Sequence, residues 1–113
     1  MSGEPSTTAV RHVDAEGLKR VLGDNRLVVI NFCAPWCGPC RLLAPKVEQL
    51  AKQHQDVIFV KVDIDECEEV SAQYNVSALP TLIAVRNGRT VGRVVGASEA
   101  DLQQMVNANR DQC

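Results

Sequence analysis

The 113-residue sequence lacks long apolar runs, an excess of either charge and a recognisable targeting signal. No stretch approaches the roughly 18 apolar residues that a membrane-spanning helix needs. Residues 1–8 lack the basic and apolar regions of a secretory signal, and Ser2 stands where myristoylation needs a glycine. The net charge of −2 gives no electrostatic reason to expect binding to nucleic acid or to an anionic membrane. We therefore expect a cytoplasmic protein.

Length and composition indicate one compact domain. The chain is long enough to bury a hydrophobic core, and its 45% hydrophobic and 23% charged residues are typical of globular proteins. We expect residues 1–8 to form a flexible lead, residues 9–109 a single domain and residues 110–113 a short tail. No repeat or long linker divides the domain, and we expect a monomer.

The hydrophobic pattern alternates between strands and helices. Strands are predicted over 8–13, 26–34 and 56–64 and as a hairpin over 81–96, with helices over 15–22, 37–54 and 66–74 and after Ser98. Strands separated by helices pair in parallel through right-handed crossovers, whereas a hairpin adds an antiparallel edge. This order predicts an α/β fold, in which helices cover both faces of a mixed five-stranded sheet.

The hairpin is predicted from a turn signal and is followed by a helix cap. Asn87-Gly88 is the strongest short hairpin signal, and Ser98 is expected to cap the last helix. Three arginines near this turn lack interleaved aromatic residues, and we interpret them as a solvated hairpin edge: Arg86, Arg89 and Arg93.

The sequence WCGPC, at residues 36–40, brings two cysteines to the predicted start of a helix. Unpaired backbone N–H groups and the positive end of the helix dipole favour an anion there, and a thiolate at Cys37 is such an anion. Cys40 lies about one turn further on the same face. Gly38 permits a tight approach, and Pro39 loses only a donor that the first turn leaves unpaired. The spacing predicts disulfide exchange, in which Cys37 attacks and Cys40 resolves the mixed disulfide.

Other uses of the cysteines compete with redox exchange. A structural zinc site needs four ligands, normally from two paired motifs, and this sequence has one CxxC motif. A cysteine hydrolase needs an imidazole near Cys37, whereas His54 is predicted at the far end of the same helix. Packing accounts for one buried cysteine better than for two that flank Gly-Pro. The odd total of five cysteines also argues against a secreted disulfide framework.

The chain resembles the thioredoxin family from about residue 9 to about residue 108. The resemblance rests on WCGPC at 36–40, VKVDID at 60–65, LPT at 79–81, NG at 87–88 and the late Gly96. It implies a thioredoxin fold, with a mixed five-stranded sheet flanked by four helices. It also implies a protein-disulfide reductase that uses its own dithiol and no cofactor. Cys37 matches the nucleophile of the family and Cys40 its resolving thiol.

The resemblance further implies a substrate-binding surface and redox partners. Pro80 matches the cis-proline of the family, and the backbone of Leu79 would face an extended substrate. An apolar rim around Cys37 would comprise Trp36, Gly38, Pro39, Leu79, Gly96 and Ala97. Electrons would come from thioredoxin reductase or an equivalent donor. They would pass to oxidised proteins such as peroxidases or ribonucleotide reductase.

Asn31 departs from the family pattern. Thioredoxins usually have a buried aspartate at this position, which is thought to take the proton of the resolving cysteine and to interact with a lysine matching Lys61. An amide cannot perform acid–base chemistry near neutral pH. Two interpretations stay open: Asn31 is a near-isostere that keeps a buried hydrogen bond, or resolution by Cys40 is slower and water takes the proton.

The remaining cysteines have two possible roles each. Cys33 is expected to pack in the interior, with pairing to another oxidised thiol as the alternative. Cys67 is also expected to be buried, although oxidation at the matching place is regulatory in some thioredoxins. Cys113, the last residue, could form intermolecular disulfides or regulate the protein.

Two alternatives to a reductase also follow from the resemblance. One is a binding or chaperone module in which redox activity is minor. The other is a disulfide isomerase or oxidase of the same fold, although oxidising members usually carry a histidine within the motif, where this chain has Gly-Pro.

Overall fold

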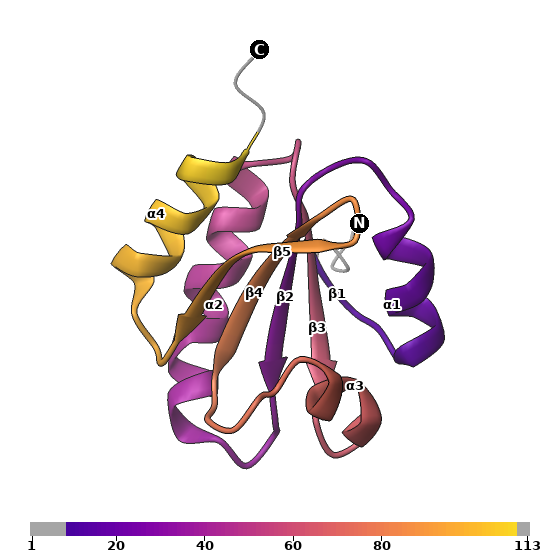
Figure 1. The fold of residues 1–113 in the computed structure, drawn as a ribbon. Helices are drawn as coiled ribbons and strands as arrows, with labels where there is room; N and C mark the ends of the chain where they lie inside the picture. The colour runs from indigo at the N-terminus through magenta and orange to yellow at the C-terminus, as the bar shows by residue number, and fades with distance from the viewer. Residues whose placement is uncertain (1–8, 111–113) are drawn as a thin grey trace, which may run out of the picture.

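The computed structural model describes residues 9–110. The expected lead over residues 1–8 and the terminal Cys113 lie outside the described residues. The elements follow in the order β1 (Val10–His12), α1 (Ala15–Leu22), β2 (Val28–Cys33), α2 (Gly38–Gln53), β3 (Ile58–Asp63), α3 (Glu68–Gln73), β4 (Thr81–Arg86), β5 (Arg89–Val95) and α4 (Glu99–Asn109) (Figure 1). Every predicted strand and helix is present, with ends that differ by a few residues.

The five strands form one mixed sheet in the order β1-β3-β2-β4-β5. β3 pairs in parallel with both β1 and β2, and β4 pairs antiparallel with both β2 and β5. The predicted parallel crossovers and antiparallel hairpin are therefore confirmed. β2 and β3 run in the same direction and β4 runs in the opposite direction. The C-terminal ends of β2 and β3 and the N-terminal end of β4 therefore lie at the same end of the sheet.

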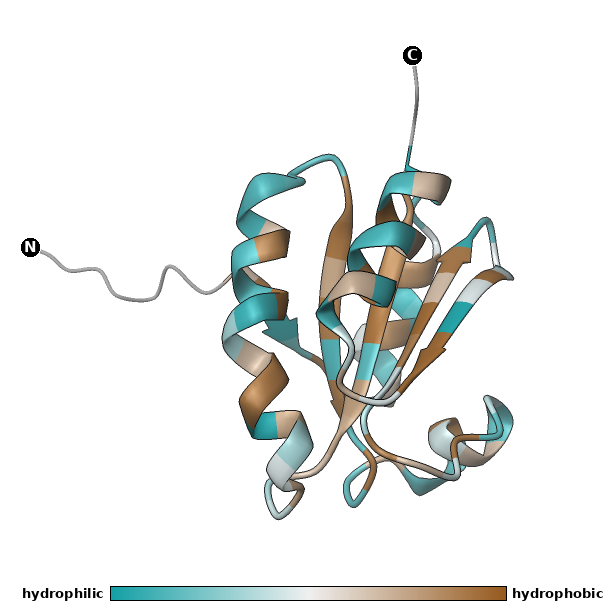
Figure 2. Ribbon diagram, turned by 90° about the vertical axis from the view of Figure 1, so that its left-hand side faces the viewer, coloured by the Kyte–Doolittle hydropathy of each residue, from teal (hydrophilic) through white to brown (hydrophobic). Residues whose placement is uncertain are grey.

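Helices cover both faces of this sheet. One face carries α2 and α4, and the other carries α1 and α3 (Figure 1). Successive residues of β2 point to opposite cores: Val29 belongs to the core under α2 and α4, and Val28 and Ile30 belong to the other. In Figure 2 the central strands are mostly brown, whereas the helices mix brown with teal. This agrees with strands buried on both sides and amphipathic helices outside.

Local signals fix the ends of several elements. The side chain of Asp14 accepts a hydrogen bond from the Gly17 N–H at the start of α1, as expected for an N-cap. Ser98 likewise accepts from the Asp101 N–H and caps α4. Asn87 and Gly88 both have positive φ angles, of 53° and 79°, which a tight two-residue hairpin turn requires. Among the described residues, no helix is long and apolar enough to cross a membrane.

Candidate active site

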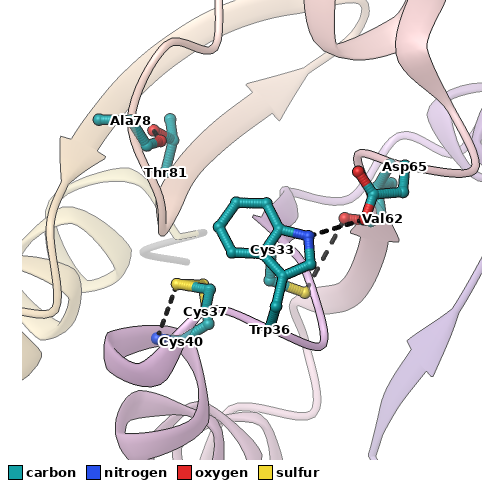
Figure 3. Close-up of a disulfide and its surroundings, with 8 residues drawn as sticks. All are labelled: Cys33, Trp36, Cys37, Cys40, Val62, Asp65, Ala78 and Thr81. Atoms are coloured by element: carbon teal, nitrogen blue, oxygen red, sulfur yellow. Dashed lines mark hydrogen bonds between the residues drawn. A yellow bond between two sulfur atoms is a disulfide. The ribbon is translucent and has the colours of Figure 1, made fainter.

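Cys37 and Cys40 are joined by a disulfide where β2 ends and α2 begins (Figure 3). Cys37 is the N-cap of α2, and the Cys40 N–H donates a hydrogen bond to its Sγ atom at 3.2 Å. Pro39, in the first turn, has no N–H that would need a partner. The helix thus directs a backbone donor at the sulfur of Cys37, an arrangement that stabilises negative charge on that atom after reduction.

A surface groove of about 410 Å³ runs beside Cys37. Trp36, Gly38 and Pro39 line it on the α2 side, residues 76–79 line it on the other side, and Ile64 also contributes. Trp36 is 66% exposed, unusually high for a residue of its size, and its indole N–H donates to the Asp65 carboxylate at 2.8 Å (Figure 3). A fixed aromatic side chain beside an open apolar groove suits contact with a protein segment rather than enclosure of a small molecule.

The loop opposite Trp36 contains the peptide bond between Leu79 and Pro80, which is cis, as the resemblance implied. Thr81 Oγ1 donates to the Ala78 carbonyl at 2.7 Å, and the Gly96 N–H donates to the Pro80 carbonyl at 2.8 Å. Leu79 packs against the cluster that contains both active-site cysteines. These contacts hold Leu79 in the groove next to Cys37.

The residues predicted to surround Cys37 do not all line this groove. Trp36, Gly38, Pro39 and Leu79 do, whereas Gly96 and the exposed Ala97 are not among its lining residues. Gly96 instead supports the loop through its bond to Pro80, and its φ of 101° is one that favours glycine.

A second cavity, of about 210 Å³, borders Cys40 and not Cys37; we call it the inner cavity, although the exposed Pro35 and Arg41 also line it. Its lining includes Cys40, Asn31, Cys33, Lys61 and Asp63. Asn31 and Lys61 are register partners on β2 and β3, and Lys61 is half-buried. The structure thus brings Asn31 and Lys61 to the cavity that Cys40 borders.

Asn31 is 3% exposed, and its Oδ1 atom accepts no hydrogen bond from any residue between 9 and 110. A buried acceptor without a protein partner is rare and unfavourable. The carbonyl end of the amide is therefore not held by a donor from the part of the chain that the structure describes. This finding argues against the interpretation in which Asn31 preserves a buried hydrogen bond through that atom.

Cys33 and Cys67 are free and buried, as expected for packing thiols. Burial raises the pKa of the Cys33 thiol; the Lys61 ammonium partly offsets this rise, and the Asp63 carboxylate adds to it. The pKa of Cys67 is also raised, first by burial and then by neighbouring acidic groups, chiefly Glu66. Both thiols stay protonated near neutral pH and are poor nucleophiles.

Sequence reasoning missed several groove residues. Ile64, Val76, Ser77 and Ala78 line the groove, and Asp65 fixes the indole of Trp36. The only available signal for three of them was their position immediately before Leu79 and Pro80. No local pattern indicated that Asp65 bonds to a side chain 29 residues away.

Comparisons with known proteins agree with this geometry. The family model described as Thioredoxin matches residues 9–108. A thioredoxin of Echinococcus granulosus is 47% identical over 100 residues, which cover 88% of this chain and 94% of that protein. The X-ray structure of Fasciola hepatica thioredoxin superimposes with a TM-score of 0.85 at 41% identity, covering 89% of this chain and all of that one.

A third similar chain comes from a structural study of the thiol resolving mechanism in yeast mitochondrial 1-Cys peroxiredoxin via glutathione/thioredoxin systems. It superimposes with a TM-score of 0.82 at 28% identity, covering 89% of this chain and 96% of that one.

The raised pKa values predict selective alkylation of the reduced protein. Iodoacetamide at pH 7 should modify Cys37 first, and Cys33 and Cys67 at least about tenfold more slowly, because their thiolate fractions are small. Peptide mass spectrometry over a time course measures each site. In denaturant the three thiols should react alike. Modification of Cys33 in the folded protein as fast as that of Cys37 would refute this account of its burial.

Proposed function

The chain belongs to the thioredoxin family and is a thiol–disulfide oxidoreductase, and we propose that it reduces disulfides in other proteins with Cys37 as nucleophile and Cys40 as resolving thiol. Members of this family work with their own dithiol and need no cofactor. The observation that carries the assignment of roles is that the two cysteines border different cavities. Cys37 lines the outer groove, and Cys40 lines the inner cavity.

The reaction follows from this division. The thiolate of Cys37 attacks one sulfur of a substrate disulfide lying in the groove, a mixed disulfide forms, and the other substrate sulfur leaves as a thiolate that takes up a proton. Cys40 then loses its proton and attacks the sulfur of Cys37, which releases the second substrate sulfur. The substrate gains two electrons and two protons overall, and the protein ends with the Cys37–Cys40 disulfide found in the structure.

The groove supports a protein as the substrate. Its walls are largely apolar and open to solvent, and the residues that line it form a surface rather than an enclosed pocket. The backbone of Leu79 beside Cys37 would pair with an extended segment of the substrate. Trp36 and Pro39 would contact its side chains on the opposite wall.

Regeneration requires an electron donor, for which we infer thioredoxin reductase or an equivalent. The similarity to a chain studied with a peroxiredoxin supports peroxidases as one class of substrate. Membership of the thioredoxin family leads us to propose ribonucleotide reductase as a second. Cys33 and Cys67 are free thiols, which supports work in a reducing compartment such as the cytoplasm. In that setting the protein would carry electrons, as a monomer, in the redox homeostasis of the cell.

Substitution of either cysteine by serine tests the two roles. Cys40→Ser should trap a mixed disulfide through Cys37 with a model substrate such as oxidised insulin, because no second thiol releases it. Steady-state turnover should fall by at least about 100-fold in both variants.

Cys37→Ser is the matched control and should form no such adduct. Non-reducing gels with peptide mass spectrometry identify the cross-linked residue. A Cys40→Ser protein whose adduct forms through Cys33 or Cys67 and not through Cys37, or a Cys37→Ser protein that turns over normally, would overturn the assignment.

The Asn31 amide bears on the resolving step. Cys40 must lose a proton toward the inner cavity, and Asn31 has no acidic form with which to accept it. Its Oδ1 atom is buried without a donor from the described residues, so it is available to a water molecule. We infer that water takes the proton in this protein, and that the step is slower than with a carboxylate.

Asn31→Asp should therefore speed the release of substrate from a preformed mixed disulfide by about tenfold. An optimally placed general base contributes more than this, and the new carboxylate would not be optimally placed. The rate should also acquire a dependence on the ionisation of the new carboxyl. Asn31→Ala removes the amide without adding a base and should give no acceleration. Rapid-quench kinetics over a pH series measures the step, and an unchanged or slower rate for Asn31→Asp would reject the inference.

A further inference from the structure

The Arg93 guanidinium joins β5 to the segment after α3. One terminal nitrogen donates to the Tyr74 carbonyl at 2.8 Å, and the other donates to the Asn75 carbonyl at 2.7 Å. The sequence placed this arginine on a solvated hairpin edge. That interpretation is incomplete, because the exposed side chain makes two charge-assisted bonds to backbone 18 and 19 residues away.

The two carbonyls lie where a helix ends. The last carbonyls of a helix have no partner within it, and basic side chains commonly supply one. α3 has no basic residue in its last turn, so Arg93 reaches in from another element. A planar guanidinium offers two donors in fixed directions, which suits two neighbouring acceptors better than a single ammonium does.

The segment that starts at these carbonyls is a wall of the outer groove. Residues 76–79 follow Asn75 directly and line the groove opposite Trp36. In Figure 1 the connection between α3 and β4 lies at the same end of the molecule as the start of α2. The backbone that faces the sulfur of Cys37 therefore continues directly from Tyr74 and Asn75, the two residues that Arg93 binds.

The other end of the same segment is also tied to β5. Gly96, the residue after β5 ends at Val95, donates its N–H to the Pro80 carbonyl at 2.8 Å. Arg93, within β5, and Gly96, directly after it, thus bond to the residues on either side of segment 76–79. We call residues 76–79 the groove loop.

We propose that Arg93 is a positioning residue for protein substrates. It fixes the position of the groove loop, so that the backbone of this loop can pair with an extended substrate segment. The inference rests on the proposed function of the groove. It assigns no chemistry to Arg93, which acts only through the backbone of Tyr74 and Asn75.

The effect should be confined to the groove loop. The Tyr74 ring packs against the Phe32 ring with centroids 5.6 Å apart, and the side chain of Val70 lies in the same buried core. Apolar contacts that do not involve Arg93 therefore hold α3 against the sheet. Because the guanidinium is exposed, its loss should weaken the fold little, while the amides of the groove loop gain freedom.

Arg93→Gln tests this role with two substrates. The KM for reduction of insulin should rise about fivefold with kcat within about twofold, because the loop binds substrate but takes no part in the exchange. Reduction of 5,5′-dithiobis(2-nitrobenzoic acid), which is too small to need the groove loop, should change by less than about twofold. Arg93→Lys keeps a charged donor group without the two fixed directions of the guanidinium, and it should recover part of the loss.

Arg89→Gln is the matched control, because it removes the same charge from the same strand at the exposed hairpin turn. It should leave both substrates unaffected. Hydrogen exchange gives a readout that does not depend on activity: the Val76 N–H, which donates to the Ser71 carbonyl, should exchange about tenfold faster in Arg93→Gln and not in Arg89→Gln.

An unchanged insulin KM in Arg93→Gln, or equal losses with both disulfides, would overturn the proposal. Unaltered exchange at Val76 would overturn it as well. If the unmodified protein fails to reduce insulin, the proposed function is wrong, and the exchange measurement still decides whether Arg93 holds the loop.

Discussion

Burial of β2 on both faces of the sheet is the constraint on which the site depends. Each of its six residues is buried, so a shift of the strand along its neighbours or a turn about its axis would expose apolar side chains. Its register and orientation between β3 and β4 are therefore fixed. Cys33 ends the strand and Cys37 begins α2 four residues later, which leaves little freedom in the junction. The start of α2 is thereby fixed at the end of the sheet where β4 also begins. Cys37 lies there beside the loop that contains the cis peptide bond before Pro80.

The same junction makes the two active-site cysteines unequal. Cys37 receives a backbone hydrogen bond and borders the groove, whereas Cys40, one helical turn along, borders the inner cavity with Asn31 and Lys61. A helix presents residues three positions apart on nearly the same face, and both thiols are 5% exposed. The cavity that each one borders is what distinguishes them, since Cys37 lies at the groove where a substrate would bind and Cys40 does not. The separate environments also mean that a change at Asn31 acts on Cys40 without altering the groove.

Much of the fold could be predicted because its signals are local. The continuous apolar run of β2, the Asn87-Gly88 turn and the Ser98 cap each depend on neighbouring residues alone. The cis peptide before Pro80 was predicted by resemblance, since no local pattern distinguishes it from the trans form. The sequence could not show that the Asn31 Oδ1 atom lacks a donor among residues 9–110, because this depends on the positions of all the elements around it. The contacts of Asp65 and Arg93 were missed since they join segments far apart in the chain.

We conclude that Cys37 and Cys40 form a reducing dithiol. The most direct test is the midpoint potential of this pair, measured by thiol trapping and mass spectrometry across glutathione or dithiothreitol redox buffers. A reducing dithiol should have a midpoint potential close to that of thioredoxin itself, about −270 mV. A potential near the roughly −120 mV of a strong protein oxidant would contradict it and indicate an oxidase or isomerase. Absence of any reversible Cys37–Cys40 disulfide would contradict it too, and would favour a binding module.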